Sequence, residues 1–169
     1  WHYQFNGQTY EPKGGQNLAP RQHARLLNPK RSSAEQVYRA VNEYRMKYPS
    51  KAVVYNGDSF DANGWAVLMA GGSIPSLSFD LPQEISAQLI GMQPIQWSGQ
   101  ANTQWVLGQQ GQGYLVYSEN VQELLADLSK EKGIFEVKYL SPKDGTFLSN
   151  TETLEGGKSY SLKNPANSG

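Results

Sequence analysis

Apolar residues are spaced differently in the two halves of the chain, and each spacing predicts a different kind of element. Between residues 33 and 48 they recur at helical intervals, which places them in one stripe along an amphipathic helix. Beyond residue 104 they occur in short alternating segments separated by glycine-containing turns, a pattern typical of β-strands. The helical stripe consists of Val37, Val41, Tyr44 and Tyr48.

The limits of this first helix are also marked in the sequence. Ser32 with Glu35, or Ser33 with Gln36, has the spacing of a capping box, in which each side chain bonds the other residue's backbone N–H. Pro49 disfavours a helical conformation in the residue before it. The helix is therefore expected to span residues 33–48.

A strand, a polar loop and a second helix are predicted between residues 51 and 73. Lys51–Tyr55 is a short apolar run that predicts a buried strand, and Asn56–Asn63 is a polar loop. Gly64–Ala70 is apolar nearly all round, as in a helix covered on most sides, and Gly71-Gly72 ends it. This order repeats in α/β barrels and open sheets, whose ligands bind where a strand runs into a loop. The loop is therefore the first place to expect chemistry.

Residues 97–169 are predicted to form a small antiparallel β-sandwich. Residues 1–32 are loop-like, and residues 82–90 form a short helix that begins at Pro82. The fold class expected is α/β followed by all-β: βα units over residues 1–93, a boundary near 92–99, and then the sandwich. The predicted strands span residues 104–108, 113–118, 121–128, 133–140, 146–149, 152–154 and 159–162.

Composition narrows the classes of ligand. The 169 residues include 15 basic and 15 acidic side chains, so no general attraction to nucleic acid or to an anionic membrane is expected. Only 18% of residues are charged, whereas 11% are aromatic, and neutral polar groups mixed with aromatic rings suit sugars. The chain has no cysteine, which excludes disulfides and thiolate chemistry, and no apolar run long enough for a membrane span.

Two groups of polar residues fit binding or catalysis. Arg21, His23 and Arg25 lie within five residues and suit an anionic or hydroxyl-rich ligand, although a solvated basic turn has the same spacing. Asp58 and Asp61 follow the predicted strand and could act as paired carboxylates, which a glycosidase needs roughly 5–10 Å apart. Asp61 equally fits a cap of the second helix.

Trp65, in the first turn of the predicted second helix, fits either a sugar-stacking floor or the core. The aromatic residues of the predicted sandwich are expected to be packing residues. No nucleotide-binding glycine loop, nucleophile elbow or metal-spaced cluster occurs in the sequence.

Several segments together resemble a known enzyme family. Four segments resemble the closing βα units of TIM-barrel glycoside hydrolases from gut and marine Bacteroidetes. Those enzymes degrade plant or algal polysaccharides. The four segments are WHYQFNG, GGQNLAPRQHARLLNPKRSS, VYRAVNEYRMKYPSKAVVY and GWAVLMAGGS. The small β-sandwich that follows the barrel in that family is similar, in order, to GYLVYS, DLS and GIFEVKYLSPKDGTF. The resemblance covers nearly the whole chain and rests on the order of the motifs.

The resemblance implies an extracytoplasmic carbohydrate hydrolase with two catalytic carboxylates and no cofactor. Residues 1–3 would end a barrel strand, residues 21–25 would lie on an active-site loop, and residues 56–58 would end a late strand. The family's usual acid and nucleophile are glutamates at the ends of middle strands, and no glutamate here has such a position. The residues expected to line the sugar site are His2, Tyr3, Arg21, His23, Arg25, Asn56, Asp58 and Trp65, with Asp58 as the catalytic candidate.

A full barrel needs about 250 residues, so at most two or three of its eight units are expected here. The leading hypothesis is therefore the C-terminal part of a glycoside hydrolase. A missing N-terminal segment or a second chain would complete its barrel, and the chain alone would be inactive. The alternatives are a non-catalytic carbohydrate- or protein-binding module, and a structural domain with no ligand. The expected partner is an oligo- or polysaccharide.

Overall fold

A computed structural model of the chain describes residues 3–5, 8–10, 32–55, 60–118, 122–163 and 165. The chain divides into two compact units, residues 1–32 and residues 33–169. In the first unit, β1 (Tyr3–Phe5) and β2 (Gln8–Tyr10) pair antiparallel. The prediction that residues 1–32 are loop-like is wrong at these two strands. The residues between them in the sequence, Asn6-Gly7, are the pair most typical of a two-residue hairpin connection.

The first helix of the second unit, α2 (Ala34–Lys47), confirms the predicted helix. Its capping box uses Ser33 and Gln36: the Gln36 backbone N–H donates to Ser33 Oγ at 3.2 Å, and the Ser33 N–H donates to Gln36 Oε1 at 3.0 Å. Val37 and Val41 are buried as predicted, whereas Tyr44 and Tyr48 lie exposed at the C-terminal end of the stripe. The stripe therefore extends beyond the surface that the described residues cover.

The second helix, α3 (Phe60–Met69), begins four residues before the predicted start at Gly64. Asp61 consequently lies inside the first turn, so its predicted position as a helix cap is wrong, and Trp65 belongs to the second turn. The predicted stop is confirmed: Gly71 has a φ of 70°, and the Gly72 N–H donates to the Val67 carbonyl at 2.8 Å. This is the hydrogen-bond pattern of a Schellman motif, which favours glycine at its left-handed position. A third helix, α4 (Gln83–Gln88), lies within the predicted span of residues 82–90.

The remaining strands form small antiparallel sheets. β3, β4 and β5 make a three-stranded sheet, whereas β6 pairs with β9 and β7 pairs with β8. The strands are β3 (Gln93–Ile95), β4 (Gln104–Gln109), β5 (Gly113–Ser118), β6 (Glu123–Asp127), β7 (Ile134–Leu140), β8 (Phe147–Glu155) and β9 (Ser159–Lys163). Two differences from the sequence expectation are the unpredicted β3, within the expected boundary region, and the fusion of two predicted short strands into β8. The described fold is mixed α/β, with helices followed by antiparallel sheets, and these residues show no barrel closure.

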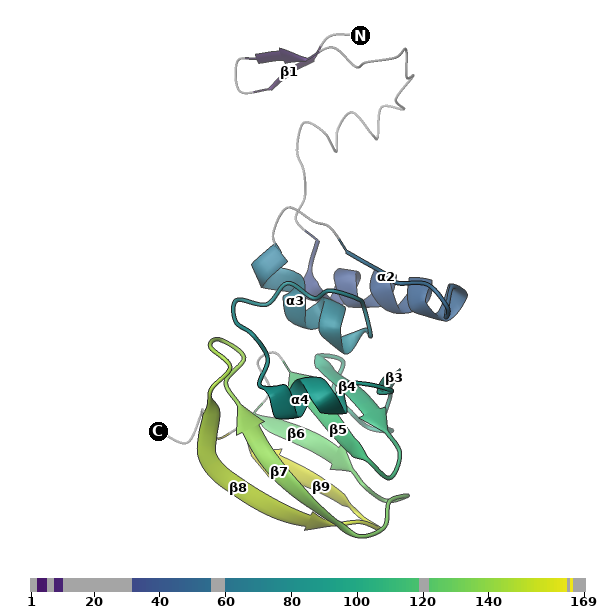
Figure 1. Cartoon of the computed structure of the whole chain (residues 1–169), viewed down its shortest axis with the longest axis vertical. Coiled ribbons are helices and arrows are strands. Elements are labelled where there is room, and N and C mark those ends of the chain that lie inside the picture. Colours follow the sequence, from purple (N-terminus) through teal and green to yellow (C-terminus); the bar gives the residue numbers. More distant parts are fainter. Residues whose placement is uncertain are drawn as a thin grey trace. The chain divides into compact units, whose positions relative to one another are not determined.

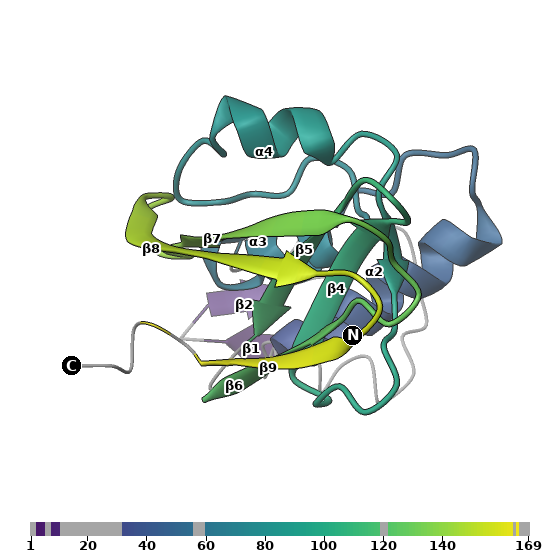
Figure 2. The same cartoon turned by 90° about the horizontal axis from the view of Figure 1, so that it is seen from below.

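The sheet β3-β4-β5 separates two hydrophobic clusters. Trp105 and Leu107 of β4 pack with the buried residues of α2 and α3, and Val106, between them in the strand, packs with residues of β6 and β8. Because alternate residues of a strand point to opposite faces, β4 is buried on both sides. Figure 1 shows the layer of α2 and α3 at one end of the sheets, and Figure 2 shows the pairs β6–β9 and β7–β8 as separate ribbons.

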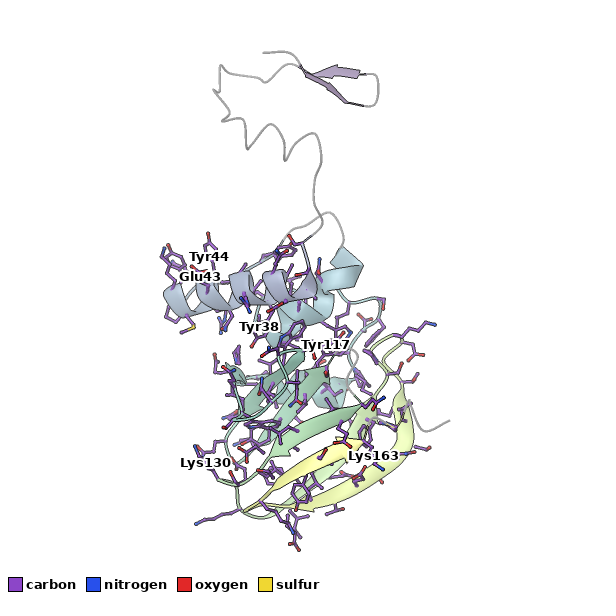
Figure 3. All side chains as sticks on the ribbon, turned by 180° about the vertical axis from the view of Figure 1, so that it is seen from behind. Tyr38, Glu43, Tyr44, Tyr117, Lys130 and Lys163 are labelled. Atoms are coloured by element: carbon purple, nitrogen blue, oxygen red, sulfur yellow. The ribbon has the colours of Figure 1, made fainter. Side chains whose placement is uncertain are left out.

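A column of aromatic rings joins the helices to the sheet. Tyr38 of α2 stacks on Trp105 at 4.9 Å between ring centroids, and Trp105 stacks on Tyr117 at 5.7 Å. Tyr117 in turn stacks on Trp65 of α3 at 5.1 Å, with the two ring planes 8° apart. Figure 3 shows Tyr38 on the side of α2 that faces Tyr117. The helices therefore share a core with the sheet β3-β4-β5, and Trp105 and Tyr117 pack in it as expected.

Candidate functional site

The segment Ala52–Tyr55, predicted as a buried strand, connects α2 to the region where ligands were expected. Val53 and Tyr55 are half-buried against the helices, whereas Val54 is 56% exposed. The segment pairs with no strand among the described residues, and its Val53 carbonyl accepts from the Ser73 N–H at 2.7 Å. The prediction of a buried strand is wrong here, because the segment forms no strand and both Ala52 and Val54 are exposed.

An open apolar hollow of about 370 Å³ lies between this segment and the C-terminal half of α2. Lys51 supplies its one charged group, and the tyrosine hydroxyls supply the other polar side-chain atoms. A sugar site needs several convergent polar groups, so the hollow by itself suits an apolar side chain better than a sugar. It is lined by Ala40, Val41, Tyr44, Tyr48, Lys51, Ala52, Val53, Val54 and Tyr55.

Most of the predicted site residues lie outside the described residues. Asn56 and Asp58 directly follow Tyr55, but neither belongs to the described part of the chain. Tyr3 lies in β1, where the structure describes the backbone alone. The other residues outside the described ranges are His2, Arg21, His23 and Arg25. Their predicted grouping around a sugar therefore stays a prediction.

Trp65 is the predicted site residue whose side chain the structure describes. It is half-buried, with one ring contact to Tyr117 and a tilted contact to Phe79 at 6.2 Å. Its Nε1–H donates to the Pro142 carbonyl at 2.9 Å. The nearby Ser78 hydroxyl donates to the Lys143 carbonyl at 3.1 Å, so the same turn is held at two points. These contacts assign Trp65 a packing role between α3 and the turn after β7, and a sugar contact stays a prediction.

A buried carboxylate that the sequence did not single out lies at the other end of the sheets. Glu131 is 7% exposed, and its carboxylate accepts from the Tyr114 hydroxyl and from the Gly111 N–H at 3.0 Å. Burial of the Tyr114 phenol, followed by this hydrogen bond, raises the pKa of Tyr114 well above its usual range. Glu131 therefore ties the β4–β5 turn to the segment between β6 and β7. Its neighbours in the sequence carried no signal of this contact.

Within the described residues, no cluster of three or more histidine, cysteine, aspartate or glutamate side chains is placed to hold a metal ion. No helix in this part of the chain has the length and apolarity needed to cross a lipid bilayer.

Comparison with known proteins identifies the first half of the chain. Residues 1–92 match a family described as a domain of unknown function (DUF6298), and they make up more than half of the 169 residues. The chain belongs to this family. No curated protein and no solved structure shows a significant match to it.

The DUF6298 region contains α2, α3 and α4 and ends directly before β3, which starts at Gln93. It therefore includes every predicted site residue, from His2 to Trp65. The sheets β3-β4-β5, β6–β9 and β7–β8 follow it, and β4 and β5 share with it the aromatic column described above.

Proposed function

We propose that this DUF6298 chain is the C-terminal part of a glycoside hydrolase that acts on plant or algal polysaccharide outside the cytoplasm. In this proposal residues 1–93 are the closing βα units of a barrel and furnish part of the sugar-binding cleft. The antiparallel sheets form an accessory domain, and the enzyme uses no cofactor.

The observation that carries the proposal is the order of α2, the segment Ala52–Tyr55 and α3, in which Val53 and Tyr55 pack against the helices. An extended segment between two helices, with one face against them, is the local arrangement of a helix-covered parallel sheet. In such folds the residues directly after a strand form the ligand site. Asn56 and Asp58 occupy those positions in the sequence.

In the proposed site Asp58 serves as one of two carboxylates, and Asn56 bonds sugar hydroxyls. Arg21 and Arg25 suit a uronate or a sulfate, because a guanidinium binds such anions through two parallel hydrogen bonds. The second carboxylate comes from the part of the barrel that the predicted βα units of this chain do not supply. The isolated chain is therefore expected to bind sugar without hydrolysing it.

Isothermal titration with plant and algal oligosaccharides tests the proposal on the chain, on Asp58→Asn and on Asp80→Asn. Asp80 is exposed and lies outside the predicted loop, so it serves as the matched control. We expect Asp58→Asn to weaken binding by at least about tenfold, since a charge-assisted hydrogen bond is lost, and Asp80→Asn to bind as the wild type does.

A fourth variant separates the alternative function, a carbohydrate-binding module centred on the sheets. Phe147 of β8 is an exposed aromatic residue there. Binding that is lost in Phe147→Ala and unchanged in Asp58→Asn would favour the module and overturn the proposed site. Robust hydrolysis by the purified, monomeric chain would contradict the expected need for further barrel segments.

A further inference from the structure

Residues beyond the DUF6298 region enclose the side chain of Trp65 in α3. The indole ring stacks on Tyr117 of β5 at 5.1 Å between ring centroids, and its Nε1–H donates to the Pro142 carbonyl at 2.9 Å. Tyr117 and Pro142 both follow the matched residues 1–92. Phenylalanine would keep a stacking ring at this position but has no N–H group. The hydrogen bond to the turn therefore depends on tryptophan.

The turn of residues 141–146, between β7 and β8, is stabilised by its own residues. Asp144 Oδ1 accepts from the Thr146 N–H at 3.1 Å and from the Thr146 hydroxyl at 2.8 Å. Gly145 has a φ of 73°, in the left-handed region that glycine adopts without strain. Figure 1 shows that the end of β7 and β8 that carries this turn lies toward the helices. The turn thus presents its carbonyls to the DUF6298 region in a defined shape.

A second segment of the DUF6298 region lies directly on the same turn. The Ser78 hydroxyl donates to the Lys143 carbonyl at 3.1 Å. A Cβ atom at Gly145 would lie 2.3 Å from the nearest atom of the Phe79 ring, closer than real contacts allow. Phe79 in turn contacts the Trp65 ring at 6.2 Å between centroids. The turn is therefore tied to α3 and to the segment after α3 by two hydrogen bonds and one close ring contact.

The tie at Trp65 lies near the end of α3 that follows the predicted sugar loop. Trp65 is five residues from Phe60, the first residue of α3, which is about 7.5 Å along the helix axis. Asp58 precedes Phe60 by two residues, which span at most about 7 Å. A shift of this end of the helix therefore moves the point from which the loop with Asp58 extends.

We propose that the β7–β8 turn acts as a strap that holds α3 at Trp65 and thereby positions the sugar site, with Trp65 as a positioning residue. The sheets thus contribute to sugar affinity without a contact to the sugar. A misplacement of about 1 Å can cost a preorganised site about 10²-fold, so the strap need not be long to matter. The inference rests on the proposed function for the location of the sugar, whereas the strap itself is independent of it.

Isothermal titration of the full chain with plant and algal oligosaccharides tests the strap in Gly145→Ala and Trp65→Phe. The first variant sets a methyl group against Phe79, and the second removes the N–H donor. Both are expected to weaken binding by at least about tenfold. Gly157→Ala is the matched control, because Gly157 has a φ of 91° at the other end of β8 but an added Cβ would meet nothing within 4 Å. It has similar backbone strain and is expected to bind as the wild type does.

Hydrogen exchange measures the strap without sugar. Residues 65–69 are expected to exchange at least about tenfold faster in Gly145→Ala than in Gly157→Ala, with β6 and β9 unchanged, and circular dichroism establishes that each variant is folded. If Gly145→Ala fails to fold, the comparison of Trp65→Phe with the wild type decides. Equal exchange in the compared chains would overturn the strap, and equal sugar affinity would overturn its positioning role. A wild-type chain that binds none of the oligosaccharides would contradict the proposed function and the positioning role with it, whereas faster exchange would still establish the strap.

Discussion

Replacing Gln104 with leucine tests how the sheet β3-β4-β5 is joined to β6. The Gln104 side chain is 1% exposed and bonds the backbone of Leu125 twice. Its Nε2–H donates to the Leu125 carbonyl at 2.8 Å, and its Oε1 accepts from the Leu125 N–H at 2.9 Å. The amide thus replaces a neighbouring strand for this one residue of β6. Leucine has nearly the same size and can make neither bond.

The expected loss follows from these two contacts. Each net hydrogen bond contributes about 1 kcal/mol, and each backbone group left buried without a partner costs about 1–3 kcal/mol. Leucine offsets part of this by burying more apolar surface. We therefore expect Gln104→Leu to lower the free energy of unfolding by about 2–4 kcal/mol, measured by urea denaturation with circular dichroism.

Two further variants make this measurement specific. Gln93 lies exposed on β3 of the same sheet, and Gln93→Leu is expected to change the free energy of unfolding by less than about 0.5 kcal/mol. Gln104→Glu keeps an acceptor for the Leu125 N–H but sets a buried carboxylate against the Leu125 carbonyl. The loss of stability of Gln104→Glu relative to the wild type should become smaller as the pH falls, because the protonated acid can donate to that carbonyl. A Gln104→Leu variant as stable as the Gln93→Leu control would refute the proposed link.

Three other predictions concern the core and one buried phenol. Gly64→Ala should lower the free energy of unfolding by about 1–3 kcal/mol in urea denaturation, although alanine favours helices. The reason is that the added Cβ would lie 1.9 Å from the Ser76 carbonyl oxygen, and a more stable variant would contradict this close approach. Trp105→Ala should lower the free energy of unfolding by about 3–5 kcal/mol. Far- and near-ultraviolet circular dichroism should report one shared unfolding transition, shifted to less stable conditions, whereas separate transitions for helices and sheets would refute a common core. Burial, together with the hydrogen bond to Glu152, raises the pKa of Tyr139 to about 12. The folded state favours the neutral phenol, so the contribution of Tyr139 to the free energy of unfolding is present below pH 10.0 and is lost as the pH rises toward 12. Tyr139→Phe should flatten that part of the profile of stability against pH.

Local signals were sufficient for much of the fold. The limits of α2 follow from the Ser33–Gln36 box and from Pro49, and the end of α3 follows from Gly71-Gly72, because caps and glycine stops act over a few residues. The start of α3 was missed because its first residues are as polar as a loop. β3 was missed because it has only three residues and contains Pro94, which gives no strand pattern. β8 looked like two strands because most of its residues are exposed on both faces.

The candidate site was less predictable because its contacts are tertiary. An apolar run such as Ala52–Tyr55 predicts a buried strand, but it does not say which segment covers it, and Val54 is exposed in the described structure. The aromatic ring of Trp65 suits a sugar-stacking floor and a core position equally well, so the sequence could not distinguish the two. Its ring contact with Tyr117 and its hydrogen bond to Pro142 depend on residues more than fifty positions away. The link between Gln104 and Leu125 had no sequence signal for the same reason.

Glycoside hydrolysis is tested most directly by assaying the gene product as it is made in its source cells. Release of reducing sugar from plant and algal polysaccharides is measured for this product and for its Asp58→Asn variant. We predict that the wild type hydrolyses at least one of these polysaccharides and that Asp58→Asn lowers kcat by about 10²–10⁴, as expected for the loss of an acid–base group. An Asp58→Asn variant with wild-type kcat would contradict the role of Asp58, and a folded gene product that releases sugar from none of them would contradict the proposed function.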